Sequence, residues 1–144
     1  MKVLSPEPML VSASSTQSNC NRAWLRSTEF LDLEDSKLRL RAQALMQLCC
    51  NDRERALRIY SYVKRMPFPR RFNPGLRSPR QVLDAGHGDA PDKAALLVAL
   101  LRLADVPSRL RYVELKGDIL RGLDCEVPKF AWPLVEVWLG GRWI

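Results

Sequence analysis

The chain has 144 residues, of which 47% are hydrophobic and 27% are charged, an ordinary balance for one globular domain with one core. Its formal net charge is +7, and basic residues crowd between Arg53 and Arg80, where Glu54 is the only acidic residue. Solvated charge on a helix face and a loop is the interpretation we favour for this segment, and binding of nucleic acid or of an acidic protein is the alternative.

Composition also limits the chemistry and the compartment. The chain has one histidine, and its four cysteines form no C-x-x-C pair, so the sequence predicts no metal site and no cofactor. Cys49 and Cys50 are adjacent, which argues against a disulfide between them and favours reduced thiols. The start of the chain lacks the apolar run of a signal peptide, and no later stretch is long enough to span a bilayer. These features predict a cytoplasmic protein with no membrane partner.

The chain is predicted to consist of a short lead-in and one domain. Residues 1–23 are rich in Ser, Pro, Thr, Gln and Asn and are predicted to be poorly ordered. Residues 24–144 are predicted to form the domain. Within it, apolar residues at helical spacing predict a first helix over about 36–48.

A second helix is predicted to begin at Asn51. Asn51 and Glu54 have the spacing of a capping box, and apolar residues follow on one side of the helix. Two prolines after Met66 end the pattern. Residues 70–80, rich in Pro, Gly and Arg, are predicted to be a loop.

Residues 86–94 have the layout of an active-site turn that opens a third, buried helix. The glycines loosen the backbone, Asp89 is predicted to cap the helix, and Asp92 is its capping partner. Apolar side chains then recur on most of the circumference until Asp105. The first exposed helical position is Ala90. A thiol there would lie against the positive end of the helix dipole, which favours the thiolate, but an alanine cannot act as a nucleophile.

The last part of the chain has the period of antiparallel strands. Alternation over 109–114 predicts a strand, and residues 116–129 are predicted to be a connection with a short helical turn at about 119–123. A second strand over 134–139 leads into a Gly-Gly hairpin turn and a return strand, both within 140–144. So short a return strand predicts a C-terminally truncated version of a longer domain. This order predicts an α+β fold, with N-terminal helices and a central buried helix packed on a small antiparallel sheet.

Three separated phrases resemble the core of a transglutaminase-like domain, in the papain-like cysteine protease superfamily. They are the run 78–83, the turn 86–94 with its leucine-rich helix and the following 106–109, and the segment 132–143. The resemblance covers about 24–144 and implies a papain-like fold. In active members, it implies acyl transfer by a cysteine, a histidine and an acid or amide.

None of the three catalytic groups stands at its matching position. The cysteine position falls on Ala90, and the histidine position, four residues before Glu136, falls on Trp132. The third member would lie beyond Ile144. The resemblance therefore implies a pseudoenzyme or interaction module that accepts a protein or peptide in a degenerate groove. The predicted groove residues are His87, Gly88, Asp89, Ala90 and Trp132.

Two other functions stay open from the sequence alone. One is a thiol acyl-transfer enzyme whose nucleophile at Ala90 has been replaced, natively or by engineering, although one replacement would not also explain Trp132. The other is a nucleic-acid or acidic-protein binder that uses the basic segment. For His87 and Cys125, a turn histidine and an unused thiol are favoured over roles in the groove. For Asp89 and Asp92, capping is favoured over a pair of acid–base carboxylates.

Overall fold

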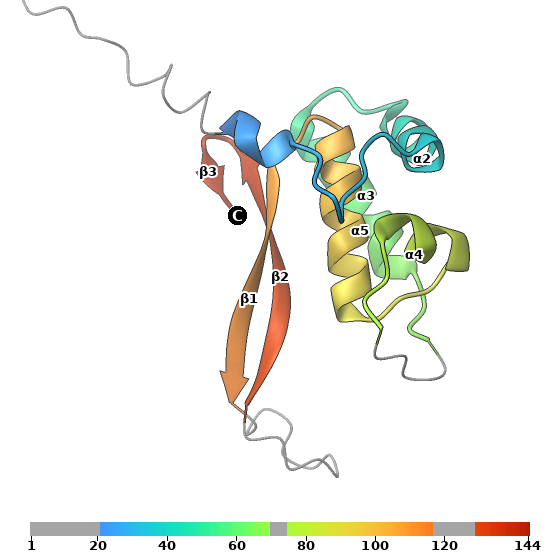
Figure 1. The fold of residues 1–144 in the computed structure, drawn as a ribbon. Helices are drawn as coiled ribbons and strands as arrows, with labels where there is room; N and C mark the ends of the chain where they lie inside the picture. Colours follow the sequence, from blue (N-terminus) through green and yellow to red (C-terminus); the bar gives the residue numbers. More distant parts are fainter. Residues whose placement is uncertain (1–20, 70–74, 117–128) are drawn as a thin grey trace, which may run out of the picture.

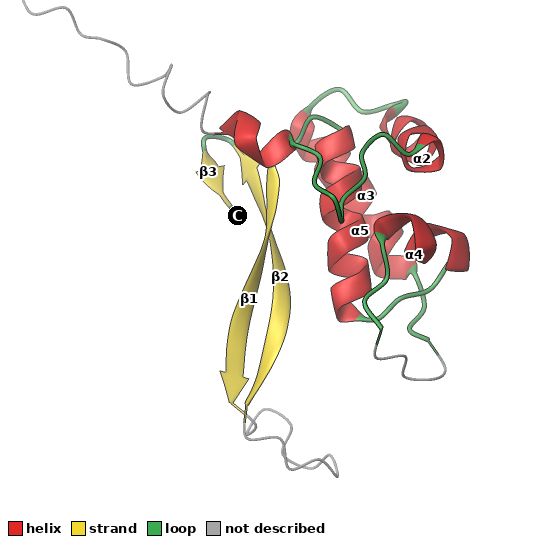
Figure 2. Cartoon of the chain, in the orientation of Figure 1, coloured by secondary structure: helices red, strands yellow, loops and turns green. Residues whose placement is uncertain are grey.

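The computed structural model describes residues 21–69, 75–116 and 129–144, which form a helical part and a sheet (Figure 1). The helices are η1 (Ala23–Leu25), α2 (Ser36–Met46), α3 (Asp52–Arg65), α4 (Pro79–Ala85) and α5 (Ala90–Leu103). The strands are β1 (Ser108–Lys116), β2 (Lys129–Leu139) and β3 (Arg142–Trp143). Helix α5 is central and contacts α2, α3, α4, β1 and β2 (Figure 2). The predicted α+β architecture is confirmed.

Polar side chains cap the N-termini of the first two α-helices by accepting hydrogen bonds from their free backbone N–H groups. The Asp35 carboxylate accepts hydrogen bonds from the backbone N–H groups of Lys37 and Leu38 at the start of α2. The Asn51 side chain accepts from the backbone N–H of Glu54 at 2.9 Å, at the start of α3. The carboxylate of Glu54 accepts in turn from the backbone N–H of Cys50 at 2.8 Å. The capping pattern predicted for α3 is confirmed.

Helix α4 differs from the sequence prediction, which placed a loop up to residue 80. The structure starts α4 at Pro79, with Ser78 as its N-cap and Gln81 completing a capping box. Proline is tolerated there because the N–H that it lacks has no partner inside the helix. The helix ends at Gly86, whose φ of +69° is the left-handed conformation common at helix C-termini.

The sheet is antiparallel in the order β1-β2-β3. Strand β2 pairs with all of β1, from Ser108 opposite Val137 to Lys116 opposite Lys129. It therefore starts earlier than the predicted strand over 134–139. The predicted Gly140-Gly141 hairpin turn is confirmed, and both glycines have positive φ, which this turn requires.

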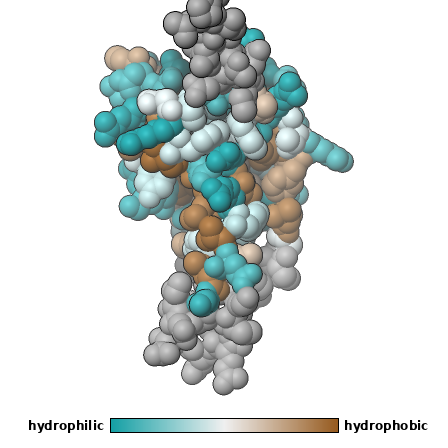
Figure 3. Space-filling model, turned by 90° about the vertical axis from the view of Figure 1, so that its left-hand side faces the viewer, coloured by the Kyte–Doolittle hydropathy of each residue, from teal (hydrophilic) through white to brown (hydrophobic). Residues whose placement is uncertain are grey.

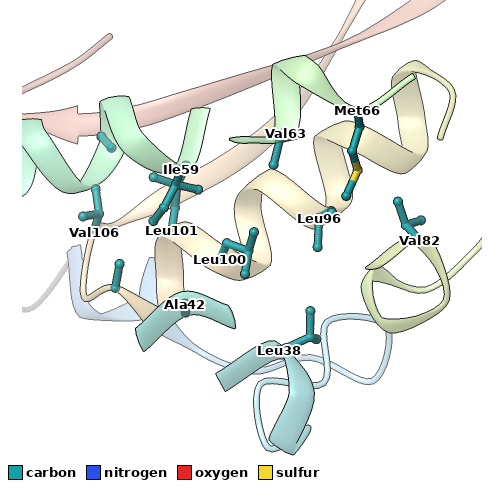
Figure 4. Close-up of a cluster of buried hydrophobic side chains, with 12 residues drawn as sticks. Leu38, Ala42, Ile59, Val63, Met66, Val82, Leu96, Leu100, Leu101 and Val106 are labelled. Atoms are coloured by element: carbon teal, nitrogen blue, oxygen red, sulfur yellow. The ribbon is translucent and has the colours of Figure 1, made fainter. Parts of the chain in front are cut away.

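The core lies where α5 meets the helices around it (Figure 4). Its largest fully buried apolar side chains are Leu38, Ile59, Val82, Leu96, Val98, Leu100, Leu101 and Val106. Burial of each leucine contributes about 1.5–3 kcal/mol. Val135, Val137 and Leu139 pack against this core from β2, so the sheet covers the remaining side of α5.

Some predictions fall outside the described residues. They are the helical turn at 119–123, most of the lead-in over 1–23, and the unused thiol of Cys125. Cys49 and Cys50 are both free thiols, which agrees with the sequence prediction.

Candidate functional site

The turn between α4 and α5 places Ala90 at the first position of α5. Asp89 precedes it, and its carboxylate accepts from the backbone N–H of Asp92 at 3.1 Å. The Asp92 carboxylate accepts from the backbone N–H of Asp89 at 3.3 Å. The predicted capping box is confirmed, so the two carboxylates stabilise the start of α5.

An ion pair that was not predicted from the sequence holds this turn in place, and one of its two residues comes from outside the turn. Arg77 lies in the segment before α4, and its Nη2 is 2.6 Å from Oδ2 of Asp92. The same nitrogen donates to the backbone carbonyl of His87 at 3.1 Å. Asp92 is buried, with 3% of its surface exposed. One guanidinium therefore neutralises the buried carboxylate and holds the turn against α5.

Gly88 is buried in the turn, at a position with no room for a side chain. A Cβ atom built on Gly88 would lie 2.8 Å from Cβ of Asp92 and 3.1 Å from Cγ1 of Val82. The backbone N–H of Gly88 also donates to the carbonyl of Pro67 at 3.1 Å, just beyond the end of α3. The turn thus contacts α4, α5 and the segment that follows α3.

The turn is built like a nucleophile-presenting turn, but its presenting position carries only a methyl group. Ala90 is half-buried at the N-terminus of α5. His87, three residues earlier, is also half-buried. Its Nδ1 is enclosed and has no hydrogen-bond partner among the described residues.

The face of the sheet that carries Glu136 also carries paired charges and aromatic rings in edge-on contact. Glu136 accepts hydrogen bonds from Arg109 Nε at 2.5 Å and from Arg111 Nη1 at 2.8 Å. The hydrogen bond from Arg109 contributes most to lowering the pKa of Glu136 below its usual range. Trp143 contacts Trp138 edge-on, with ring centroids 5.5 Å apart. In Figure 3, apolar patches lie between hydrophilic ones on this side of the molecule.

A groove of about 1520 Å³ runs between α3, α5 and β2, and we call it the α3–β2 groove. Trp132 lines it from β2, and Lys93 and Ala94 line it from the first turns of α5. Ala90 is not among its lining residues, nor are the turn residues 87–89. Of the predicted groove residues, four therefore share one turn, and Trp132 belongs to a neighbouring surface.

The described residues contain neither a metal-binding cluster nor a helix that could span a membrane. No group of three or more His, Cys, Asp or Glu side chains in this part of the chain is arranged to hold a metal ion. No helix within the same residues has both the length and the apolar character needed to cross a bilayer.

A helical part built around the buried helix α5, followed by an antiparallel sheet, defines an α+β domain. Residues 39–144 match the sequence model of the transglutaminase-like superfamily, and the chain belongs to that superfamily. The resemblance predicted from the three phrases is confirmed. A comparison with curated proteins gives no match.

Two solved structures share the fold. One is described as a "putative cysteine protease" from Cytophaga hutchinsonii, with a TM-score of 0.70, 18% identity and coverage of 92% of this chain. The other is described as a "putative protease" from Parabacteroides distasonis ATCC 8503, with a TM-score of 0.57, 21% identity and coverage of 85% of this chain. The chain spans 43% of the length of the first protein and 25% of the second.

The groove also contains residues that the sequence analysis did not place there. Tyr60 lies on α3, 49% of its surface is exposed, and it lines the groove. Lys64 and Lys93 line the groove as well. Helical spacing places Tyr60 and Lys64 on one side of α3, which is a usable signal. Only the tertiary structure brings that side of α3 opposite β2.

Proposed function

We propose that this transglutaminase-like domain binds a protein or peptide segment in the α3–β2 groove and does not catalyse thiol acyl transfer. Two positions support the proposal, Ala90 at the family's cysteine position and Trp132 at its histidine position. A methyl group cannot attack a carbonyl. An indole has an N–H donor and no basic nitrogen near neutral pH, so Trp132 cannot take a proton from a thiol.

The cost of these replacements is large in this type of chemistry. Catalytic residues of a triad act as a unit, and loss of the nucleophile alone costs on the order of 10⁶ in kcat in a well-measured serine protease. Loss of the nucleophile together with the base leaves no route for the thiol mechanism.

The observation that carries the proposal is the composition of the groove. Among the residues that the structure describes, its lining contains no cysteine, histidine, serine or threonine. It contains instead a wide apolar surface from α3, α5 and β2. Its volume exceeds the roughly 300–1,000 Å³ of pockets that take small molecules, which favours a polypeptide as the occupant. The proposal includes no cofactor and no membrane partner.

An amidase and transamidase assay of the purified chain tests the catalytic half of the proposal. Glutamine-containing peptides serve as substrates, with and without an amine acceptor, and iodoacetamide serves as the thiol reagent. We expect rates equal to those of the buffer control, with or without the reagent. Amide hydrolysis that iodoacetamide abolishes would contradict the proposal, because Cys49, Cys50 or another thiol would then be acting as the nucleophile.

The second candidate function is a thiol enzyme whose nucleophile has been replaced at Ala90. The intact turn favours it, because Gly88, Arg77 and Asp92 still hold the presenting position in place. The Ala90→Cys variant tests it directly in the same assay. We expect that variant to stay inactive, because no imidazole stands at Trp132. Activity in the single variant would establish the second candidate instead.

We also propose that the protein works in the cytoplasm. Cys49 and Cys50 are free thiols, and such thiols persist in reducing compartments. Cell fractionation with an antibody against the chain tests this, and recovery in a secreted fraction would contradict it.

A further inference from the structure

The α3–β2 groove gathers exposed apolar side chains from three parts of the chain. Leu57 and Tyr60 come from α3, Phe68 follows that helix, and Trp132 and Leu134 come from β2. All five are exposed, with fractions from 42% for Trp132 to 63% for Phe68. Single exposed apolar residues are normal on a protein surface, whereas a contiguous group is typical of an interaction site.

Four basic side chains surround this apolar surface. They are Arg53, Lys64, Lys93 and Arg142, and Asp52 is the one acidic residue in the lining among the described residues. The Asp52 carboxylate already pairs with Arg55 at 3.3 Å.

None of these four basic groups forms an ion pair with a residue in the described part of the chain. Apart from the pair of Asp52 with Arg55, the ion pairs found there join residues outside the groove lining, for example Lys37 with Asp84 and Arg109 with Glu136. Positive charge is therefore left unneutralised at the groove, while much of it is neutralised on other surfaces of the molecule.

The side chain of Lys93 brings one of these positive charges into contact with the apolar surface of the groove. It lies on α5, and its Nζ is 4.5 Å from the centre of the Phe68 ring. The same nitrogen is 3.4 Å from the backbone carbonyl of Lys64, so the two lysines lie beside each other. Burial lowers the pKa of the Lys93 ammonium. A carboxylate that entered the groove would offset this cost.

We infer that the occupant of the α3–β2 groove is an acidic, amphipathic peptide segment, with apolar side chains on the groove surface and Asp or Glu side chains at its basic rim. The inference rests on the proposed function and specifies the chemistry of the partner. Charge complementarity carries it, because the four basic groups line a space whose one acidic side chain among the described residues, Asp52, is already paired with Arg55.

Two other macromolecular occupants fit the surface less well. Nucleic-acid interfaces are polar, and phosphate contacts dominate them, whereas this groove has aliphatic side chains at its centre, including Val63, Leu97 and Leu101. A second copy of this chain would bring a net charge of +7 to a basic surface, which like-charge repulsion opposes.

Fluorescence anisotropy with three labelled peptides tests the inference. The first repeats leucine at helical spacing with glutamate at the other positions, the second has glutamine in place of glutamate, and the third has lysine. We expect the glutamate peptide to bind at least about tenfold more tightly than the glutamine peptide, and the lysine peptide not to bind. We also expect added salt to weaken only the binding of the glutamate peptide.

A double charge-reversal variant tests whether the preference for the glutamate peptide arises in the groove. Lys64→Glu with Lys93→Glu is expected to remove the preference for the glutamate peptide. Arg22→Glu with Arg58→Glu changes the net charge equally at positions outside the groove lining, and the preference is expected to remain. Lys64→Gln with Lys93→Gln gives a milder second test, with circular dichroism confirming that each variant is folded.

Each alternative outcome overturns a defined statement. Equal affinity for the glutamate and glutamine peptides overturns the acidic partner and leaves the proposed binding function in place. Absence of binding by all three peptides overturns both. Hydrolysis of a bound peptide overturns the proposed lack of catalysis alone. Tighter binding of a single-stranded oligonucleotide, or self-association that Leu57→Ser abolishes, overturns the acidic peptide as the occupant.

Discussion

Arg77 and Asp92 form a buried ion pair that closes the turn in front of α5, with Nη2 of the arginine 2.6 Å from Oδ2 of the aspartate. We expect Arg77→Ala to destabilise the domain by about 2–4 kcal/mol, because it leaves a buried carboxylate without its counter-charge. Lys37→Ala is the matched control. It breaks an ion pair with Asp84 whose two side chains are about half exposed, and it is expected to cost about 0–1 kcal/mol.

Urea unfolding followed by circular dichroism measures both changes in the free energy of unfolding. A cost for Arg77→Ala no larger than that for Lys37→Ala would mean that solvent reaches Asp92 when Arg77 is gone.

The two glycines of the same turn are expected to respond differently to substitution by alanine. Gly88→Ala places a Cβ atom 2.8 Å from Cβ of Asp92, so the turn must shift, at a cost of about 2–3 kcal/mol. Gly86→Ala meets open space and costs about 1 kcal/mol, because alanine adopts the left-handed φ of +69° poorly. Denaturant titration of the two variants compares them, and an equal or larger loss for Gly86→Ala would contradict this view of the turn.

Capping in this fold could be predicted from the sequence because it is local. Asn51 with Glu54, and Asp89 with Asp92, are three residues apart, and the structure contains both pairs as predicted. Helix α4 was missed although it has the same kind of signal in Ser78 and Gln81. Its seven residues follow a segment rich in Pro and Arg, and no long apolar period marks it.

The groove could not be predicted, because its parts are far apart in the sequence. Lys64 and Trp132 lie on α3 and β2, and nothing in either segment indicates that they line one surface. The ion pair of Arg77 with Asp92 likewise joins residues fifteen positions apart. Strand β2 starts at Lys129, earlier than the predicted strand over 134–139, and it includes Pro133, which pairs opposite Tyr112 although proline is rare inside sheets.

Glu136 is expected to make stability depend on pH in the acidic range. Its hydrogen bonds to Arg109 and Arg111 lower its pKa in the folded state below the ordinary value of about 4.5. Its contribution is therefore fully present above about pH 4.5 and is lost as the pH falls through the lowered folded-state value. Glu136→Gln removes the titrating group, so the stability difference between wild type and variant should shrink on acidification.

Unfolding titrations of both proteins between neutral pH and pH 3 would measure this difference. Asp35 and Asp84 also have lowered pKa values, and both remain in the variant, so their contributions cancel. A difference that stays constant over the range would show that Glu136 keeps no charge interaction with the two arginines in solution.

Substitution of three tryptophans by alanine is expected to distinguish aromatic residues that stabilise the fold from one that binds the peptide. Trp24 and Trp143 contact each other edge-on at 6.0 Å, and the Arg109 guanidinium lies 4.2 Å from the centre of the Trp143 ring. Trp143→Ala should therefore cost about 2–3 kcal/mol through lost packing and cation–π contact, and Trp24→Ala should cost less but release η1. Trp132→Ala should change stability by less than about 1 kcal/mol, because 42% of the residue's surface is exposed, and should weaken peptide binding in the groove. Thermal unfolding combined with peptide anisotropy distinguishes the two kinds of residue, and a Trp132→Ala variant that binds the glutamate peptide as well as wild type would remove Trp132 from the binding surface.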